Sequence, residues 1–552
     1  MSKHFPAFAI LLIHGALFMG VFNQWINPHP DMLDHWVWSR VFAFSYYEHP
    51  PMVAWLMRTM TSLTGNSEFS LELWAQIINL TILLLAYGIT ARLFNPRAGL
   101  WTLILLESSL YWFYGSAFFH IDQPFLIFWL INLYLAVRFC QCGKTRYLLG
   151  LGVVAGFGAL SKYITLLFYV GFGLHLLFHK ALRKNLWNPW LYLAGIISLL
   201  IFTPVLWWNY QHEWVSFRFQ FGRGMSGADF GQNFIWFTLG HILLFSPVWS
   251  VWIFRALWLH RRSMFDPDFS GSVILTISLF GLTFFSLMSF RGNIADPHWA
   301  NVGYLGAMIV SGKWLSDQWE ENRNKKRLIL LAGMGAGINV LIGGLLFWHI
   351  LTPIQDVTLY KLRYLDGFKS LNMPDTVVEK LRPIFKKEVR GYSGFHQRLS
   401  SILTQEELRQ YQTDIVKLAI QPTSDIATPL IKWSETASDL DQLLKVANRF
   451  PADYVVSREY QFSSALSFYL ENQPFPHSLQ KPERNQWSPV EQLKTGNTIM
   501  VCQFAQCPQV KQRSETLIQQ KFTWLGDIKT ESNGRIVRWF AVYANRPQTE
   551  HQ

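Results

Sequence analysis

A segment of charged and aromatic residues separates the first two long apolar blocks of the chain. The stretch "DMLDHWVWSRVFAFSYYEHPPMVAWLMR", residues 31–58, contains Asp31, Asp34, Glu48 and His49. A carboxylate in such a segment can take a proton from a hydroxyl that attacks as a nucleophile. Because the Pro-Pro pair after His49 stops a helix and extends the residue before it, we expect one or two interfacial helices, broken at this pair. An ordinary solvated loop is the alternative.

Another acid, Asp122, begins the apolar stretch "DQPFLIFWLINLYLAV". This stretch predicts a membrane helix without a further acid, and an ionisable group at the mouth of such a helix usually faces a cavity or a partner. A helix N-cap, with Pro124 in the first turn, is the other interpretation. The two roles are compatible, and Asp122 is a candidate catalytic residue.

Basic residues are expected on the same side of the membrane as these acids. Lys162, in "GALSKYITLLF", lies at the outer end of a predicted span, where a lysine either holds a lipid phosphate or extends to the surface. Arg58, Arg218 and Arg223 are further cations on this side. His298, in "SFRGNIADPHWANVGYL", is either a ligand or an ordinary structural histidine. The cations favour a substrate that carries a phosphate.

The composition indicates that these residues belong to a membrane protein. Of the 552 residues, 50% are hydrophobic and only 15% are charged, against roughly 25% charged in soluble domains. Up to about residue 350 the apolar residues form blocks of roughly 18–24, which is long enough to cross a bilayer. The net charge of +12 comes from cations at the ends of these blocks. Such cations act as orientation signals, so we exclude a nucleic-acid partner.

We predict a polytopic α-helical membrane domain over residues 1–350, with about eleven spans. The basic segments "RLFNPR", "RFCQCGKTR", "HKALRKN", "RALWLHRRS" and "EENRNKKR" fall in alternate connections, which the positive-inside rule places in the cytoplasm with the N-terminus. The loop 25–71 and the C-terminal part then face outward. The pair 147–161 and 163–179 is either two crossings or a re-entrant pair. The spans are about 6–24, 72–92, 98–115, 121–138, 147–161, 163–179, 190–208, 233–255, 272–290, 299–315 and 328–350.

Residues 351–552 are expected to form a soluble α/β domain outside the membrane. Polar helical stretches such as "MPDTVVEKLRPIFKKE" alternate with strand-like runs such as "DYVVS", "TIMVCQF" and "RIVRWFAVYA". The domain either covers the active site or docks the acceptor, or it acts as a stabilising cap. Cys502 and Cys507 lie in this external part, where they form a disulfide or remain thiols.

Two classes of function follow from the residues alone. External carboxylates, external cations and a dense aromatic belt suit an enzyme that uses a membrane lipid with an anionic phosphate. A transporter would be expected to place polar groups near the middle of the bilayer. Glu107, in "ILLESSLYWF", is the main polar residue in such a position, and it keeps a transporter or flippase of a lipid-linked sugar as the alternative.

Several stretches of the chain resemble bacterial glycosyltransferase family 39. The stretches are "YYEHPPMVAWL", "HIDQPFLIFW", "GALSKYITLL" and "PVLWWNYQHEWVSFRFQ", and the external "SREYQFSSALSFYL" and "ERNQW" resemble segments of some bacterial members. This family includes lipid A aminoarabinose transferases and protein O-mannosyltransferases, which share the GT-C membrane fold. The resemblance covers most of the chain and is weakest over about 350–445.

The resemblance implies a glycosyltransferase of the bacterial inner (plasma) membrane, with the C-terminal domain in the periplasm. The donor would be a sugar on a polyprenyl phosphate. An acceptor hydroxyl or phosphate would attack the anomeric carbon, and the lipid phosphate would leave. Lipid A or core lipopolysaccharide is the expected acceptor, and a protein is the second.

The resemblance also implies roles for the acids. Asp31 matches the first-loop Asp that acts as a base or orients the acceptor, and Asp34 is its nearby competitor. Asp122 matches the second Asp of the family. Both Asp31 and Asp122 are therefore expected to be catalytic, with Asp34 expected to contact substrate.

The same resemblance assigns the cations to the leaving phosphate. Lys162 would neutralise that phosphate, and Arg58, Arg218 and Arg223 are weaker candidates. His49 is a further candidate to bind the substrate. It stands where aminoarabinose transferases have a Lys, and this departure weakens transfer of that donor specificity to the chain.

A divalent metal (Zn, Mg or Mn) is sometimes found near the family's site. Glu48 matches the Glu before the Pro-Pro pair, and His298 matches a downstream His near a Trp. These two residues are the candidate metal ligands.

Overall fold

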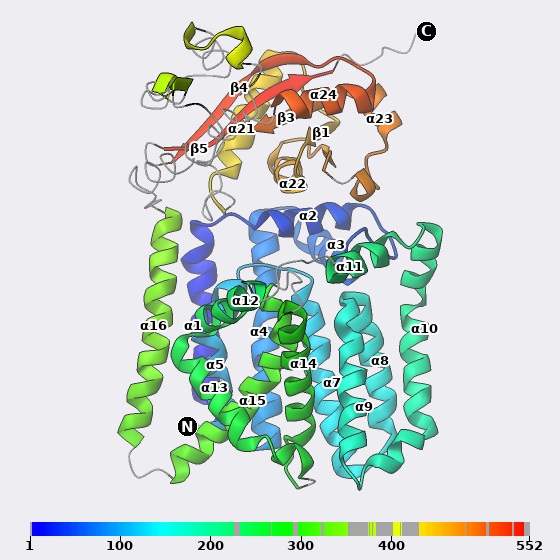
Figure 1. Ribbon diagram of the computed structural model, residues 1–552, viewed down its shortest axis with the longest axis vertical. Helices are drawn as coiled ribbons and strands as arrows, with labels where there is room; N and C mark the ends of the chain where they lie inside the picture. Colours follow the sequence, from blue (N-terminus) through cyan, green and yellow to red (C-terminus); the bar gives the residue numbers. More distant parts are fainter. Residues whose placement is uncertain are drawn as a thin grey trace. The chain divides into compact units, whose positions relative to one another are not determined.

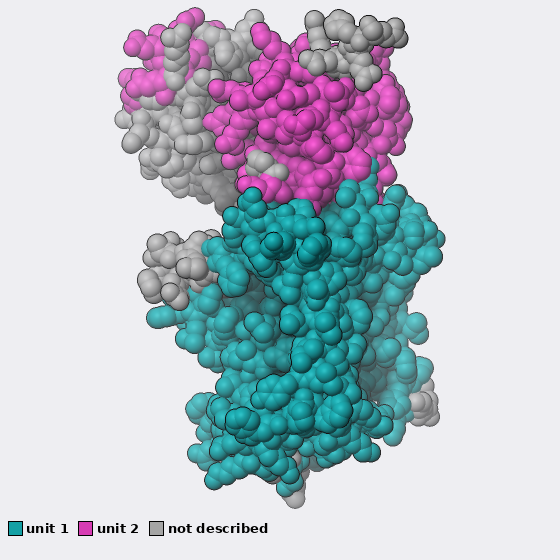
Figure 2. Space-filling view, turned by 90° about the vertical axis from the view of Figure 1, so that its right-hand side faces the viewer, with its two compact units in different colours: residues 1–24, 38–345 teal, residues 25–37, 346–552 magenta. Residues whose placement is uncertain are grey.

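The computed structural model divides into two compact units (Figure 2). The first unit comprises residues 1–24 and 38–345, and the second comprises residues 25–37 and 346–552. The segment with Asp31 and Asp34 therefore groups with the C-terminal part of the chain. The structure describes residues 3–225, 232–266, 268–290, 296–321, 325–351, 430–480, 482–503, 507–532 and 535–545, with short pieces between 374 and 410.

The first unit consists of helices and short 3₁₀ turns (Figure 1). Helix α2 (Pro30–Arg40) is divided between the units after residue 37, and α16 (Lys325–Leu351) is divided after residue 345. The other helices are α1 (Phe5–Gly20), α3 (Met52–Thr64), α4 (Glu68–Leu93), α5 (Pro96–Glu107), α6 (Leu110–Gly115), α7 (Asp122–Cys142), α8 (Thr145–Ser161), α9 (Leu166–Phe178), α10 (Pro189–Gln211), α11 (Val215–Met225), α12 (Gln232–Phe245), α13 (Pro247–His260), α14 (Ser272–Phe290) and α15 (Asn301–Glu321). The 3₁₀ turns are η1 (Phe22–Gln24), η2 (Tyr163–Thr165), η3 (Arg183–Trp187), η4 (Ser263–Phe265) and η5 (Pro297–Ala300).

The long apolar helices make the chain a multi-pass membrane protein. Within the described residues, 6 helices are long and apolar enough to cross a membrane, or up to 7 if one bent pair counts as a single span. The helices that qualify singly are α1 with η1, α4, α7, α10, α14 and α16. Helices α8 and α9 are apolar but shorter. Among the described residues, length and composition therefore identify six or seven of the predicted eleven spans, and the count of eleven stays a prediction.

Two predicted spans are not continuous helices. The span 98–115 breaks after Glu107, where the hydroxyls of Ser108 and Ser109 donate to the carbonyls of Ile104 and Leu106 and compete with the helical pattern. The span 233–255 breaks between α12 and α13, which meet at 103°. Pro247 begins α13, and proline disfavours helical backbone in the residue before it.

Close contacts between helices depend on small residues. A Cβ on Gly152 of α8 would clash with the Ala194 carbonyl of α10, and a Cβ on Gly312 of α15 would clash with the Thr102 hydroxyl of α5. In lipid, such close backbone approach provides the van der Waals contact that holds helices together. Small residues thus set these two pairings of the bundle.

Helices α7 and α8 form an antiparallel hairpin, and they lie side by side (Figure 1). Gly143 closes α7 in the left-handed conformation, with φ 64°, which favours glycine. The basic residues Arg138 and Lys144 flank this turn. Because the hairpin is antiparallel, the start of α7 and the end of α8 meet at its other end.

The second unit contains a 5-stranded sheet with the strand order β2-β1-β3-β5-β4. Strand β1 pairs in parallel with β2 and β3, whereas β5 pairs antiparallel with β3 and β4. The strands are β1 (Tyr454–Ser457), β2 (Phe475–Ser478), β3 (Thr498–Gln503), β4 (Thr523–Ser532) and β5 (Arg535–Ala544). The helices are α21 (Trp433–Val446), α22 (Tyr460–Tyr469), α23 (Val490–Thr495) and α24 (Cys507–Ile518), with the turn η8 (Pro482–Arg484).

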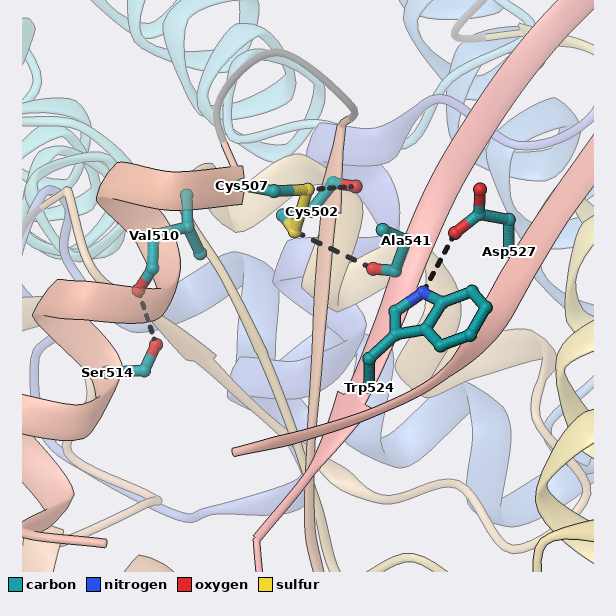
Figure 3. The surroundings of a disulfide bond; sticks show 7 residues. All are labelled: Cys502, Cys507, Val510, Ser514, Trp524, Asp527 and Ala541. Carbon is teal, nitrogen blue, oxygen red and sulfur yellow. Dashed lines mark hydrogen bonds between the residues drawn. A yellow bond between two sulfur atoms is a disulfide. The ribbon is translucent and has the colours of Figure 1, made fainter. Parts of the chain in front are cut away.

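A disulfide joins β3 to α24. Cys502 and Cys507 are bonded, with their Cα atoms 5.2 Å apart (Figure 3). Both side chains are buried in an apolar cluster with Val510, Phe522 and Ala541. The structure thus selects the disulfide from the two alternatives for this pair, while Cys140 and Cys142 of α7 are free thiols.

Candidate functional site

A buried ion pair lies at the open end of the α7–α8 hairpin. Asp122 is the first residue of α7, and Lys162 directly follows α8. The Lys162 Nζ lies 2.5 Å from the Asp122 Oδ1, and the two side chains are only 13% and 9% exposed. The N-cap position of α7 belongs to Ile121, so the interpretation of Asp122 as an N-cap is wrong. An ionised carboxylate is costly in a membrane helix unless it has a partner. Asp122 has such a partner in the Lys162 ammonium.

Two histidines face the same carboxylate. His120 Nδ1 lies 3.8 Å and His298 Nε2 lies 3.9 Å from the Asp122 Oδ2. The turn η5 presents His298, and His241 anchors this turn by donating from Nε2 to the Pro297 carbonyl at 2.7 Å. Burial lowers the pKa of His298, so its imidazole is neutral at neutral pH. The cluster therefore holds one cation and one anion, with the neutral His298 imidazole beside them.

An aromatic ring covers part of this cluster. The Tyr111 ring of α6 is stacked on His298, with the ring planes 7° apart. The break between α5 and α6 is what allows Tyr111 to reach this position instead of continuing along the α5 axis. Sequence reasoning did not select Tyr111 or His120, although His120 is only two positions from Asp122.

The predicted metal ligands were Glu48 and His298. Within the described residues, no group of three or more His, Cys, Asp or Glu side chains is arranged to hold one. The Asp122 carboxylate lies near His120 and His298, but it is already paired with the Lys162 ammonium at 2.5 Å. The backbone carbonyl of Glu48, the other predicted ligand, accepts a hydrogen bond from Gln220 Nε2 at 2.6 Å. The assignment of Glu48 and His298 as metal ligands stays a prediction.

The loop between α2 and α3 is built around the Pro-Pro pair. As expected, two helices flank this break, because α2 ends at Arg40 and α3 begins at Met52. The Tyr46 hydroxyl donates to the Val41 carbonyl at 2.7 Å, and Trp55 Nε1 donates to the Ala43 carbonyl at 2.9 Å. These bonds to backbone acceptors hold the loop in a defined conformation.

Helix α11 is hydrogen-bonded to the residues that precede the Pro-Pro pair. Gln220 Nε2 lies 3.4 Å from His49 Nδ1, in addition to its bond with the Glu48 carbonyl. The Tyr163 hydroxyl, next to Lys162, lies 2.7 Å from Ser216 Oγ of α11 and 3.4 Å from Ser45 Oγ. The segment with Glu48 and His49 is therefore connected through α11 to the turn that carries Lys162.

The other predicted cations lie in different surroundings. Arg58 Nη1 donates to the Ser39 carbonyl at 3.0 Å, so its guanidinium caps the end of α2. Arg218 pairs with Glu213 at 3.3 Å, and both side chains are largely exposed. Arg223 lies in α11, but its side chain is outside the described part of the chain. The structure brings Lys162 to Asp122, whereas Arg58 and Arg218 have other partners.

Asp31 and Asp34 lie in the second unit in contrasting environments. Asp31 is 31% exposed and accepts a hydrogen bond from the Tyr460 hydroxyl at 2.8 Å. Asp34 is only 3% exposed, and its oxygens accept bonds from Ser464 Oγ at 2.9 Å and Arg484 Nη2 at 3.1 Å. A carboxylate with a buried guanidinium partner is a poor base, because its charged form is strongly favoured. The geometry favours Asp31 over Asp34 as a base.

Glu107, which motivated the transporter alternative, has a partner inside the first unit. It is the last residue of α5, and its Oε2 lies 2.8 Å from His14 Nδ1 of α1. The two side chains are 12% and 1% exposed. This contact explains the acid as a link between α1 and α5.

Comparisons with known proteins place this geometry in context. A sequence family described as dolichyl-phosphate-mannose-protein mannosyltransferase matches residues 48–208. The lipid A galacturonosyltransferase RgtD of Rhizobium johnstonii is 27% identical over 310 residues, which are 52% of this chain. The chain thus spans only 61% of the length of that curated relative.

Two crystal structures of ArnT from Cupriavidus metallidurans resemble the whole chain. The structure bound to undecaprenyl phosphate matches with a TM-score of 0.60 and 15% sequence identity, covering 99% of both chains. The structure in the apo state matches with a TM-score of 0.57 and 16% identity, covering 98% of both chains. The chain has the fold of ArnT, which confirms the predicted fold class at the level of overall architecture.

Proposed function

We propose that this chain is a glycosyltransferase of the bacterial inner membrane that moves a sugar from a polyprenyl phosphate to lipid A or core lipopolysaccharide. The observation that carries the proposal is the buried Lys162 ammonium, held at 2.5 Å by Asp122 in a bundle with the fold of ArnT. ArnT was crystallised with undecaprenyl phosphate, and RgtD is a lipid A galacturonosyltransferase. The first supports a lipid-phosphate donor, and the second supports a lipid A acceptor.

Lys162 acts on the leaving group. An ammonium has three N–H donors, and one of them is directed at Asp122. The remaining donors can bind the phosphate oxygens as negative charge develops on them. Asp122 orients the ammonium and fixes its charge in place. In this respect Asp122 serves catalysis through Lys162.

Asp31 acts on the acceptor. An oxygen of the acceptor attacks the anomeric carbon, while the bond between that carbon and the phosphate oxygen breaks. Polyprenyl phosphate leaves with the bonding electron pair. The proton of an acceptor hydroxyl passes to the Asp31 carboxylate, which is exposed enough to receive it.

We propose that the membrane domain spans residues 1–350 with eleven crossings, and that residues 351–552 form a periplasmic domain. Turns rich in cations support this orientation, since Arg92 and Arg97 flank the α4–α5 turn and Arg138 and Lys144 flank the α7–α8 turn. The positive-inside rule makes these turns cytoplasmic. The N-terminus is then cytoplasmic, and Asp122 with Lys162 lies at the periplasmic side.

A protein acceptor is the second candidate. It is supported by the match of residues 48–208 to a family of protein mannosyltransferases. The donor chemistry would be the same, and only the acceptor would differ.

A deletion strain separates these candidates. Mass spectrometry of lipid A and core from the strain should show the loss of one sugar, which the wild-type gene restores and the Asp31→Asn variant does not. Unchanged lipid A and core, with a sugar missing from periplasmic proteins, would select the protein acceptor. No missing sugar in any of these fractions would contradict the proposed function.

A further inference from the structure

A network of side chains in the second unit surrounds the proposed base. The Tyr460 hydroxyl donates to Asp31 Oδ1 at 2.8 Å. The Arg484 guanidinium lies over the Tyr460 ring, 3.4 Å from its centre, and also donates to Asp34 Oδ2 at 3.1 Å. The network therefore joins two acids of α2 through a tyrosine of α22 and an arginine of η8.

The network rests on one face of α22. Tyr460, Ser464 and Phe468 are four residues apart, so they lie in a row along the helix. Tyr460 bonds Asp31, Ser464 bonds Asp34, and Phe468 packs edge-to-face on Trp36 with ring centres 5.0 Å apart. Each contact fixes a successive part of α2, and together they set the rotation of this helix about its axis.

We propose that Tyr460, held in place by Arg484, positions the Asp31 carboxylate to receive the acceptor proton. This inference rests on the proposed function and deepens it. It assigns the segments "SREYQFSSALSFYL" and "ERNQW" a part in the active site. The C-terminal part of the chain is then a component of catalysis and not only a stabilising cap.

The buried ion pair of Arg484 with Asp34 explains why the arrangement is rigid. Arg484 and Asp34 are each 3% exposed, and a buried ion pair of this kind is held strongly because neither charge can be left alone. The guanidinium also attracts the face of the Tyr460 ring. Tyr460 consequently has little freedom to turn its hydroxyl away from Asp31. Its hydrogen bond fixes the plane of the carboxylate, whose side chain is still 31% exposed.

The charged and titratable groups around Asp31 define how it should respond to pH. Among the described residues they include His29, whose Nδ1 lies 3.7 Å from Asp31 Oδ2, and Tyr460, with Asp34 and Arg484 one layer farther along the network. A hydrogen bond to the charged carboxylate favours that form. Loss of the Tyr460 hydroxyl should therefore make the base easier to protonate.

The Tyr460→Phe variant tests the proposal because it keeps the ring under Arg484 and removes only the hydroxyl. The assay uses full-length protein in proteoliposomes, undecaprenyl phosphate carrying galacturonic acid as donor, and purified lipid A. We expect kcat to fall about tenfold to hundredfold, with the donor KM unchanged and the acidic limb of the pH profile moved to higher pH. The matched control is Tyr454→Phe, which removes a hydroxyl bonded to Gln492 at 2.8 Å in the same unit and should change neither quantity.

A second measurement does not depend on sugar transfer. Carbodiimide labels carboxyl groups, and peptide mass spectrometry measures the labelling of Asp31 as a function of pH. The midpoint should move to higher pH in Tyr460→Phe and stay in place in Tyr454→Phe. Equal midpoints in Tyr460→Phe and wild type would overturn the inference.

The failure of this inference and the failure of the proposed function are distinguishable. If Asp31→Asn abolishes transfer while Tyr460→Phe retains the wild-type kcat and pH profile, the positioning role is wrong and the function stands. If Tyr460→Phe lowers both kcat and thermal stability but leaves the pH profile unchanged, the role of Tyr460 is structural. If the wild type forms no glycosidic bond with the sugar that is missing from the deletion strain, the function itself is wrong.

Discussion

Lys162 Nζ and Asp122 Oδ1 lie 2.5 Å apart at the end of the α7–α8 hairpin, and both side chains are almost fully buried. A buried pair of opposite charges is neutral as a whole, but removing one partner leaves an uncompensated charge. The pair is thus both a structural constraint and a source of positive charge that a phosphate can share. These two contributions can be separated by mutation.

The single variants Lys162→Met and Asp122→Asn should both lower stability, by about 3–5 kcal/mol for the lysine change, because each breaks the buried pair. The double variant should recover much of this stability, since no charge is left unpaired. It should still fail to transfer sugar, because the leaving phosphate has lost its cation. Thermal unfolding in detergent and sugar transfer would be measured together.

A matched control exists in α15. Lys313 and Asp317 also lie 2.5 Å apart, but they are neighbours on one helix and each is more than a quarter exposed, at 27% and 29%. Lys313→Met should cost at most about 1 kcal/mol and leave transfer unchanged. Full activity of the Lys162–Asp122 double variant would remove both residues from the catalytic site.

Asp31 and Asp34 should behave in opposite ways when each is changed to Asn. Asp34→Asn leaves the buried Arg484 without its carboxylate, so we expect a loss of stability of about 3–5 kcal/mol. Asp31→Asn leaves a part-exposed neutral group bonded to Tyr460, so we expect a nearly unchanged unfolding temperature and no sugar transfer. Unfolding curves and transfer rates would be compared for the two variants, and an active Asp31→Asn protein with wild-type rate would reject Asp31 as the base.

Arg58→Met should lower stability and leave binding of the donor unchanged. The Arg58 guanidinium donates to the Ser39 carbonyl, and loss of that bond should cost about 1–2 kcal/mol. The donor KM should stay at the wild-type value. A raised donor KM in a protein of unchanged stability would instead assign Arg58 to the phosphate, as the family resemblance implied.

His477 should make the second unit sensitive to acid. Its Nδ1 donates to the Ser488 carbonyl at 3.1 Å, and its Nε2 accepts from Asn485 Nδ2 at 3.3 Å, so the neutral ring is fully bonded. Burial lowers the pKa of His477 to about 4, whereas an unfolded histidine titrates near about 6.5. Between these values the unfolded state binds the extra proton, so stability should fall as pH falls through this window and stay level above it.

Hydrogen exchange of the full-length protein at pH values from about 7 to 4 would measure this effect in the peptides of β1 and β2. The His477→Gln variant should be less stable at neutral pH but show a flatter dependence on pH. An equally steep dependence in this variant would assign the acid sensitivity to another group.

Much of the membrane part could be predicted from the sequence, because the hydropathy of a spanning segment is a local property of one helix. Each of the eleven predicted segments has a helical counterpart. The breaks after Glu107 and at Ser246 were missed, because apolar residues continue across both positions and only the local serine and proline chemistry ends the helices. Tyr111 owes its place beside His298 to the first of these breaks.

The contacts of the candidate residues were harder to predict. Asp122 and Lys162 were selected one at a time, and the hairpin that joins them depends on Gly143. Tyr460 and Asp31 are separated by 429 positions, so no local pattern indicates their contact. Arg58 was selected for its charge, but the charge is directed at the backbone of α2. Residue type thus predicts the available chemistry, whereas tertiary contacts determine which residue uses it.

The most direct test of the proposed function is a transfer reaction with purified full-length protein in proteoliposomes. Undecaprenyl phosphate carrying the sugar that is missing from the deletion strain would be supplied with lipid A, and mass spectrometry would follow both lipids. Our account predicts that lipid A gains the mass of one sugar while free undecaprenyl phosphate appears in equal amount, and that Asp31→Asn produces neither. Movement of the lipid-linked sugar across the bilayer without a new glycosidic bond would contradict it.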